Sequence, residues 1–328
     1  MKKRIALVTG GYTGESVISL KSAAVVEKII DKERYDVYKI FIYPGNWHHL
    51  TETGEKVMVD LNDFSLTING EKIKFDGIFN ILHGSPGEDG KLAGYFDMIG
   101  LPYTTCDQLT SAITMNKSYT KAIVDDIPEL HIAKSIQLFE NSAANISRID
   151  SELTLPLFIK PNNGGSSIGM SKVKTWEELP AALDKAFSED TQVLVEEFIS
   201  GREFSIGAFR GKGEINVLPS TEIVSSKEFF DFESKYIAGM TEEITPGRMN
   251  TEEVERVGRI ATQVYEKLNC KGAVRIDYFL QKETAQFYFI EINTVPGQTE
   301  TSLISQQVKA IGKDVKEFYT ELIEEMFS

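Results

Sequence analysis

The sequence predicts an α/β protein, and two observations support this fold class. In the first third of the 328 residues, apolar strands alternate with a helix whose apolar residues recur at helical spacing, which indicates a parallel sheet. Further along the chain, short strands predominate and fewer helices separate them, which is typical of an α+β arrangement. We therefore expect an N-terminal parallel α/β domain followed by strand-rich parts.

The N-terminal part opens with a strand, a glycine loop and a helix. These three elements are predicted at residues 5–9, 10–14 and 15–30, and two further strands at 35–43 and 75–82. Between the last two strands, Asn69-Gly70 favours a type I′ hairpin, so we interpret residues 57–76 as an insertion at the sheet edge. Ligand sites of parallel sheets lie at the carboxyl ends of the strands, which places His83 at the rim of a site.

The same patterns predict the remaining elements. A helix is expected at residues 108–124, strands at 132–139, 155–161, 193–199, 203–210 and 215–224, and a helix at 176–187. The long polar and aromatic stretch 225–250 is expected to be a functional loop. A cap at Asn250 or Thr251, with acidic residues in the first turn, indicates a helix at 251–268. The chain is expected to end with two strands, at 273–280 and 286–293, and two helices.

Composition and charge argue against several classes of protein. The 35 basic and 49 acidic residues give a formal net charge of −14, whereas a surface for nucleic acid needs clustered Lys and Arg. No apolar run approaches the roughly 18 residues that span a bilayer, so a membrane is not an expected partner either. Cys106 and Cys270 are the only cysteines, and no export signal precedes them, which predicts reduced thiols in the cytoplasm.

The glycine loop after the first strand does not match a dinucleotide site. Gly10-Gly11-x-x-Gly14 lacks the G-x-G-x-x-G spacing, and the second strand ends without the acidic residue that would bind a ribose. Two interpretations of Glu15 remain open at this point. It could bind the ammonium group of a small ligand, or it could be a favourable acidic residue in the first turn of a helix.

Residues 158–170 (FIKPNNGGSSIGM) have the pattern of a phosphate-binding hairpin. Lys160 ends a strand, and the Gly/Ser loop after it offers backbone N–H donors that no large side chain shields. A Walker A loop would instead carry Gly-Lys-Ser/Thr before a helix, so a P-loop NTPase is not expected. The alternative of a surface hairpin without function fits less well, because Lys160 lies on an apolar strand.

A third group of residues has the pattern of a metal site. Glu291 and Asn293 lie two residues apart on one strand, hence on one face, and Asp277 lies on the preceding strand of an expected hairpin. Hard oxygen ligands suit Mg²⁺ that bridges ATP phosphates. A solvated face is the alternative, but these carboxylates interrupt apolar runs, where a cation must compensate them. Arg275 points the same way as Asp277 and would face developing negative charge.

Together, the loop 160–169, Lys235-Tyr236, Arg275-x-Asp277 and residues 291–297 resemble the ATP-grasp ligases. More narrowly, the chain resembles the D-alanine:D-alanine ligase family from Gly10 to Leu303. The resemblance implies an N-terminal α/β domain and two ATP-grasp subdomains that clasp ATP between their sheets. We expect these domains at residues 1–106, 107–200 and 201–328. Family membership further implies two D-alanine molecules and ATP as substrates, and a homodimer.

The resemblance implies a nucleotide site with a metal. Its residues would act on four parts of the ligand: Lys117, Lys160, Ser167 and Lys235 on the phosphates, Glu196, Glu197, Phe198 and Ile199 on adenine, Glu203 on the ribose, and Asp277, Glu291 and Asn293 on Mg²⁺ or Mn²⁺. Two metal ions are expected. Glu197-Phe198 stands where the family often has Lys-Trp, which leaves the side chains that contact adenine open. Met-Asn-Lys at residues 115–117 also replaces the usual Met-Asp-Lys, with the lysine retained.

The resemblance also implies roles around the amino acid substrates. Glu15 would hold the ammonium group of the first D-alanine, in a triad with Ser166 and Tyr236. The oxyanion and the second D-alanine would be bound by Arg275, the Gly297 amide, Ser302 and Leu303, and His83 would lie near the substrates. Two alternatives remain. One is a related ligase with another second substrate such as D-lactate, against which the Lys-Tyr pair argues. The other is a non-catalytic ATP-binding protein.

Overall fold

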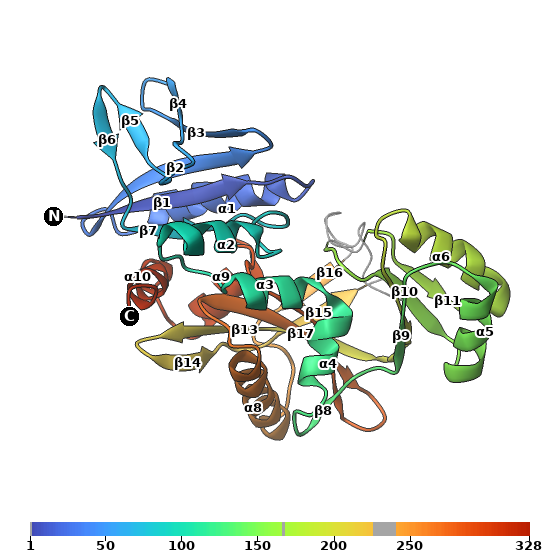
Figure 1. The fold of residues 1–328 in the computed structure, drawn as a ribbon. Coiled ribbons are helices and arrows are strands. Elements are labelled where there is room, and N and C mark those ends of the chain that lie inside the picture. Colours follow the sequence, from blue (N-terminus) through green and yellow to red (C-terminus); the bar gives the residue numbers. More distant parts are fainter. Residues whose placement is uncertain (1, 166–167, 226–240) are drawn as a thin grey trace.

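Three β-sheets and the helices packed on them organise the chain, which confirms the predicted α/β class (Figure 1). The computed structural model describes residues 2–165, 168–225 and 241–328. In this part of the chain the three sheets have five, four and seven strands, and a separate hairpin forms a two-stranded sheet. No helix within these described ranges is both long and apolar enough to cross a membrane.

The N-terminal sheet contains the predicted parallel strands. In spatial order its strands are β4 (Lys56–Met58), β3 (Asn46–Leu50), β2 (Tyr35–Tyr43), β1 (Lys3–Gly10) and β7 (Gly77–Asn80). Strand β1 pairs in parallel with both β2 and β7, so their carboxyl ends share one edge. Helices α1 (Ser16–Ile29) and α2 (Lys91–Ile99) follow β1 and β7. The predicted hairpin forms from β5 (Leu66–Ile68) and β6 (Glu71–Ile73), with Asn69 and Gly70 at φ of 51° and 81°, as a type I′ turn requires.

The central sheet is antiparallel and carries helices on one face. Its strands are β11 (Ser171–Val173), β10 (Leu157–Pro161), β12 (Val193–Glu197) and β9 (Ser135–Leu138), and its helices are α5 (Ala143–Glu152) and α6 (Leu179–Phe187). Leu157, Ile159 and Val195 belong to the core under these helices. Because side chains alternate along a strand, Lys160 and Glu196 lie on the opposite face, which lines a cavity.

The third sheet forms the floor of a large cavity. Its main order is β16 (Thr241–Ile244), β15 (Thr221–Ser225), β13 (Gly201–Gly211), β17 (Ala273–Gln281), β18 (Phe287–Asn293) and β8 (Leu130–His131), and β14 (Glu214–Val217) pairs with β13. Helix α8 (Thr251–Lys267) supplies Val257, Ile260 and Val264 to the core of this sheet. Asn250 caps α8, because its side chain accepts from the Glu253 N–H and the Glu253 carboxylate accepts from the Asn250 N–H.

A shared core joins the N-terminal sheet to the end of the chain. Ile5 and Leu7 of β1 belong to the same buried cluster as Val308 of α9 (Leu303–Ala310) and Phe318 of α10 (Val315–Glu325). The first and last parts of the chain therefore pack directly on each other, and α10 contacts both α1 and α9. Residues of α1 and of α9 line the same cavity.

The structure corrects three of the predicted elements. The single helix expected at 108–124 is two helices, α3 (Gln108–Met115) and α4 (Lys117–Val124), because Asn116 is extended and its side chain caps α4. The strand expected at 215–224 is divided into β14 and β15, and Pro219 lies in the gap, where it cannot donate to a ladder. Helix α5 lies in a segment for which no element was predicted, and the segment 225–250 contains strand β16. The predicted domain boundaries stay a prediction.

Candidate active site

One large cavity, of about 1940 Å³, lies where the three sheets meet. Sixteen residues predicted from the sequence to belong to the site line this cavity: Glu15, His83, Lys117, Lys160, Glu196, Glu197, Phe198, Ile199, Glu203, Arg275, Asp277, Glu291, Asn293, Gly297, Ser302 and Leu303. Ser166, Ser167, Lys235 and Tyr236 lie outside the described residues. The fold thus brings together positions that are spread over nearly 300 residues of sequence, from Glu15 to Leu303.

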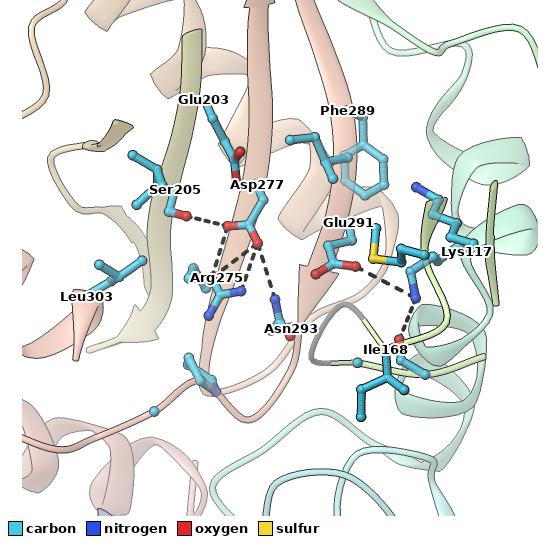
Figure 2. A pocket seen from close by; sticks show the side chains of 18 of the residues that line it. Lys117, Ile168, Glu203, Ser205, Arg275, Asp277, Phe289, Glu291, Asn293 and Leu303 are labelled. Carbon is cyan, nitrogen blue, oxygen red and sulfur yellow. Dashed lines mark hydrogen bonds and ion pairs between the residues drawn. The ribbon is translucent and has the colours of Figure 1, made fainter. Parts of the chain in front are cut away.

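The antiparallel pairing of β17 and β18 builds the charged floor of this cavity. Asp277 pairs with Glu291 and Arg275 pairs with Asn293, so all four side chains share one face, as predicted. The Asp277 carboxylate accepts a hydrogen bond of 2.6 Å from Ser205 Oγ and a hydrogen bond of 2.8 Å from Arg275 Nη2 (Figure 2). Asn293 Nδ2 lies 3.5 Å from the same carboxylate.

This floor has the donor atoms of a divalent cation site. Asp277 and Glu291 supply carboxylates and Asn293 an amide, which are hard oxygen ligands suited to Mg²⁺. Within the described ranges, no three His, Cys, Asp or Glu side chains gather as a metal site by themselves. Burial alone would lower the pKa of Arg275, but Asp277, together with Glu291 and Glu88, outweighs burial and raises it.

Buried lysines face the floor from the other side of the cavity. Lys117 Nζ lies 3.7 Å from Glu291 and donates to the Gly164 carbonyl at 2.5 Å, as Figure 2 shows. Lys160 forms an ion pair with Glu196. Burial and the nearby Lys117 lower the pKa of Lys160 to about 7, and the Glu291 carboxylate works against this shift. The two predicted phosphate-binding lysines thus point into one space.

Lys121 is a further buried lysine that the sequence analysis missed. It forms an ion pair with Glu196 and, like Lys117, lies on α4. The two lysines are four residues apart, so they occupy one face of the helix. That spacing within a predicted helix was the available sequence signal.

The strand expected to contact adenine lines the cavity beside these lysines. Glu196 is almost fully buried, whereas the Glu197 side chain accepts a 3.0 Å hydrogen bond from the Thr154 N–H. Lys172 Nζ lies 3.6 Å from the centre of the Phe198 ring. Glu197 is therefore engaged with the chain that follows α5, which leaves Glu196 as the carboxylate directed into the site.

The Glu15 carboxylate lies against two glycines from distant segments. A Cβ on Gly84 would lie 2.5 Å from Glu15 Oε2, and a Cβ on Gly165 would lie 2.8 Å from Glu15 Oε1. A side chain at either position would therefore displace the Glu15 carboxylate, and Gly84 also has φ of +68°, which favours glycine. Glu15 itself immediately precedes α1 and makes no side-chain cap to it. Of the two interpretations of Glu15, this placement favours a ligand-binding carboxylate over a helix-stabilising one.

The start of α9 closes the cavity near Arg275. Ser302 occupies the N-cap position, and its Oγ accepts a 2.9 Å hydrogen bond from the Thr299 N–H. A Cβ at Gly297 would lie 2.8 Å from Ser302 Oγ, so a side chain at this position would crowd the site. Helix N-termini favour anions, which suits a substrate carboxylate at Ser302 and Leu303.

A hydrogen-bond network from the N-terminal domain brackets Val295. His83 Nδ1 donates to the Val295 carbonyl at 2.6 Å, and Glu88 accepts from the Val295 N–H at 3.2 Å and from the Gly84 N–H at 2.6 Å. His83 Nε2 lies 3.3 Å from Ser22 Oγ, which accepts a 3.2 Å hydrogen bond from the Gln298 N–H. The network thus fixes the backbone on both sides of Gly297.

Burial explains the charge state of this network. It lowers the pKa of His83 to about 4, so the imidazole is neutral, and it raises the pKa of Glu88 to about 8, with Glu15 adding to the rise. The sequence analysis missed Glu88 and Ser22. An acidic residue shortly after a strand end could have indicated Glu88, whereas nothing in the sequence singled out Ser22.

Comparison with known proteins identifies the family. A family model described as the D-ala D-ala ligase N-terminus matches residues 4–106, and one described as the D-ala D-ala ligase C-terminus matches residues 126–324. The chain belongs to the D-alanine–D-alanine ligase family. The resemblance stated from the sequence is therefore confirmed.

Individual members agree over the whole chain. A D-alanine–D-alanine ligase of Parabacteroides distasonis is 43% identical over 99% of this chain and 98% of its own length. Among solved structures, the VanG D-Ala:D-Ser ligase of Enterococcus faecalis is similar with a TM-score of 0.90 and 33% identity, over 99% of this chain and all of its own. A D-alanine–D-alanine ligase of Bacillus anthracis complexed with ATP has a TM-score of 0.79 and 28% identity, over 100% of this chain and 97% of its own.

A buried carboxylate at the edge of the same cavity depends on two arginines. Arg202 Nε lies 2.9 Å from the Glu222 carboxylate and Arg248 Nε lies 2.7 Å from it. Burial alone would raise the pKa of Glu222, but the hydrogen bonds from Arg248 and Arg202 outweigh it and lower the pKa to about 2. Ionised Glu222 therefore stabilises the junction between β13, β15 and the segment that leads to α8.

Replacing this carboxylate should make stability less dependent on acid pH. A depressed carboxyl pKa contributes stability above the unfolded value of 4.5, and this contribution is lost as the pH falls through the folded value of about 2. We expect Glu222→Gln to lower the free energy of unfolding by about 2 kcal/mol at pH near 7 and by progressively less below pH of about 4. Urea unfolding at several pH values measures this, with exposed Glu214→Gln as the control. A deficit that stayed constant into acid would contradict the assignment.

Proposed function

We propose that this protein joins two D-alanine molecules into D-alanyl-D-alanine at the expense of ATP, through an acyl phosphate, for peptidoglycan precursor synthesis. The observation that supports this most strongly is the meeting of three groups in one cavity: the acidic floor of β17 and β18, the lysines opposite, and Glu15. The family relationship gives the same reaction class.

In the first half-reaction, the carboxylate of one D-alanine would attack the γ-phosphate of ATP, which would form the acyl phosphate and release ADP. Glu15 would hold the ammonium group of this D-alanine, while Lys117 and Lys160 neutralise charge that spreads over the phosphate oxygens. Asp277, Glu291 and Asn293 would hold two Mg²⁺ or Mn²⁺ ions, which would offset the negative charge of the phosphates. Ser167 and Lys235 are proposed to assist with phosphate and Glu203 to bind the ribose.

In the second half-reaction, the amine of the other D-alanine would attack the acyl phosphate carbonyl. Arg275 and the Gly297 N–H would stabilise the tetrahedral oxyanion before phosphate leaves. Ser302 and Leu303, at the N-terminus of α9, would bind the carboxylate of the incoming D-alanine. His83 and Glu88 would act by fixing the Val295 backbone, and so the Gly297 amide. Ser166 and Tyr236 are proposed to complete the triad with Glu15.

The setting of the reaction is also proposed. Cys106 and Cys270 are free and buried, which fits reduced thiols and a cytoplasmic enzyme with access to ATP. A homodimer is proposed from family membership alone.

A second candidate function is ligation of D-alanine to another acceptor, because the similar VanG structure is named as a D-Ala:D-Ser ligase. D-lactate is a further acceptor to be tested.

Phosphate release tests the proposed reaction directly. Purified protein with ATP and Mg²⁺ is expected to release phosphate when D-alanine is added, with one dipeptide formed for each phosphate. L-alanine is expected to cause no phosphate release. D-serine and D-lactate, each supplied with D-alanine, test the alternative acceptors by mass analysis of the product. Phosphate release that does not depend on any D-amino acid would contradict the ligase proposal, and a mixed product as the main one would favour the second candidate.

Replacing Arg275, the cation proposed to stabilise the oxyanion, should slow the chemical step and leave nucleotide binding intact. Arg275→Ala is expected to lower kcat for dipeptide formation by about 100-fold or more, because an oxyanion donor acts in the transition state. ATP affinity, measured by calorimetry, should change by less than about threefold on this view. Arg256→Ala is the matched control, since Arg256 pairs with Glu129 away from the cavity. Loss of ATP affinity equal to the loss of kcat would mean that Arg275 binds phosphate instead.

A further inference from the structure

Three buried charged side chains meet between α4 and the central sheet. The side chains of Lys121, Glu196 and Lys160 are only 5%, 6% and 4% exposed. Each oxygen of the Glu196 carboxylate contacts a different ammonium group, Oε1 that of Lys121 and Oε2 that of Lys160. Lys121 comes from a helix that packs on β18, whereas Lys160 and Glu196 come from the adjacent strands β10 and β12. The cluster therefore connects two of the three sheets across the cavity.

The charge balance of this cluster changes when a triphosphate binds. Lys160 faces the cavity and is a proposed phosphate ligand, so it must exchange its contact with Glu196 for contact with phosphate oxygens. If Lys160 were the only partner of Glu196, that exchange would leave a buried carboxylate without a counter-charge, which is strongly unfavourable. Lys121 supplies a second ammonium group on the far oxygen of the same carboxylate.

We propose that Lys121 is a positioning residue for nucleotide binding, which stays paired with Glu196 and thereby frees Lys160 for the phosphates of ATP. The inference rests on the proposed function, because that function brings ATP to Lys160. Lys121 acts through Glu196 and need not contact the nucleotide itself. The same pairing holds the Glu196 carboxylate in place in the cavity wall, where it can accept a hydrogen bond from the adenine amino group.

The variant Lys121→Met removes the charge and keeps the length of the side chain. We expect the KM for ATP to rise by roughly 10- to 100-fold, because Glu196 then competes with phosphate for Lys160. The KM for D-alanine should stay within about twofold, since no D-alanine ligand has changed. A role in folding alone would lower the melting temperature without this difference between the two KM values.

A double-mutant cycle with Glu196→Gln separates the proposed role from a direct contact with phosphate. Without the carboxylate, Lys160 needs no release, so Lys121→Met should change the KM for ATP by less than about threefold in the Glu196→Gln background. An equal rise in both backgrounds would overturn the proposal and would assign Lys121 to the phosphates. If Lys121→Met alone fails to fold, the double variant can still be compared with Glu196→Gln. The double variant contains no buried carboxylate that lacks a partner, so it is expected to fold.

A matched lysine controls for the loss of any buried ion pair. Lys313 Nζ lies 2.5 Å from the Glu321 carboxylate, which is 8% exposed and belongs to α10. Lys313→Met should lower the melting temperature and leave both KM values unchanged. Failure of the proposed function would appear in the wild-type protein as a lack of D-alanine-dependent phosphate release. Failure of this inference would appear instead as an active Lys121→Met variant with an unchanged KM for ATP.

Discussion

The antiparallel pairing of β17 with β18 is the constraint on which the site depends. Because side chains alternate along each strand, this register places Arg275, Asp277, Glu291 and Asn293 on one face and leaves Val274 and Ile276 for the core behind it. A slip of one residue would turn every one of these groups to the other face. The neighbouring strand β13 reinforces the arrangement, since Ser205 lies opposite Asp277 and donates to its carboxylate.

Buried charge is the second constraint, and the structure meets it by pairing. Asp277 has Arg275, Glu196 has two lysines, and Glu222 has two arginines. Each pair lines the same cavity, so a protein with a net charge of −14 still presents a group of cations to an anionic ligand. The pairs also hold charged side chains in place before substrate binds. These side chains therefore need not reorient during the reaction, which lowers its free-energy barrier.

Local sequence patterns predicted the strands and the shared face of the hairpin well, because both depend on alternation over a few residues. They failed where a single side chain overrides the local pattern, as Asn116 does when it breaks one expected helix into two. Sequence signals could have singled out Glu88 and Lys121, but the partners of these two residues and of Ser22 could not be foreseen, since each contact joins segments far apart in the chain. The roles of Ser166, Ser167, Lys235 and Tyr236 remain predictions from the resemblance alone.

Positional isotope exchange tests the central claim, that the β17–β18 face activates the γ-phosphate for transfer to a carboxylate. ATP labelled with heavy oxygen between its β- and γ-phosphates is incubated with D-alanine, and scrambling of the label reports reversible formation of the acyl phosphate. The wild-type protein is expected to scramble the label only when D-alanine is present. Glu291→Gln should lower the rate by about 100-fold or more. Scrambling by Glu291→Gln at the wild-type rate would contradict this account of the site.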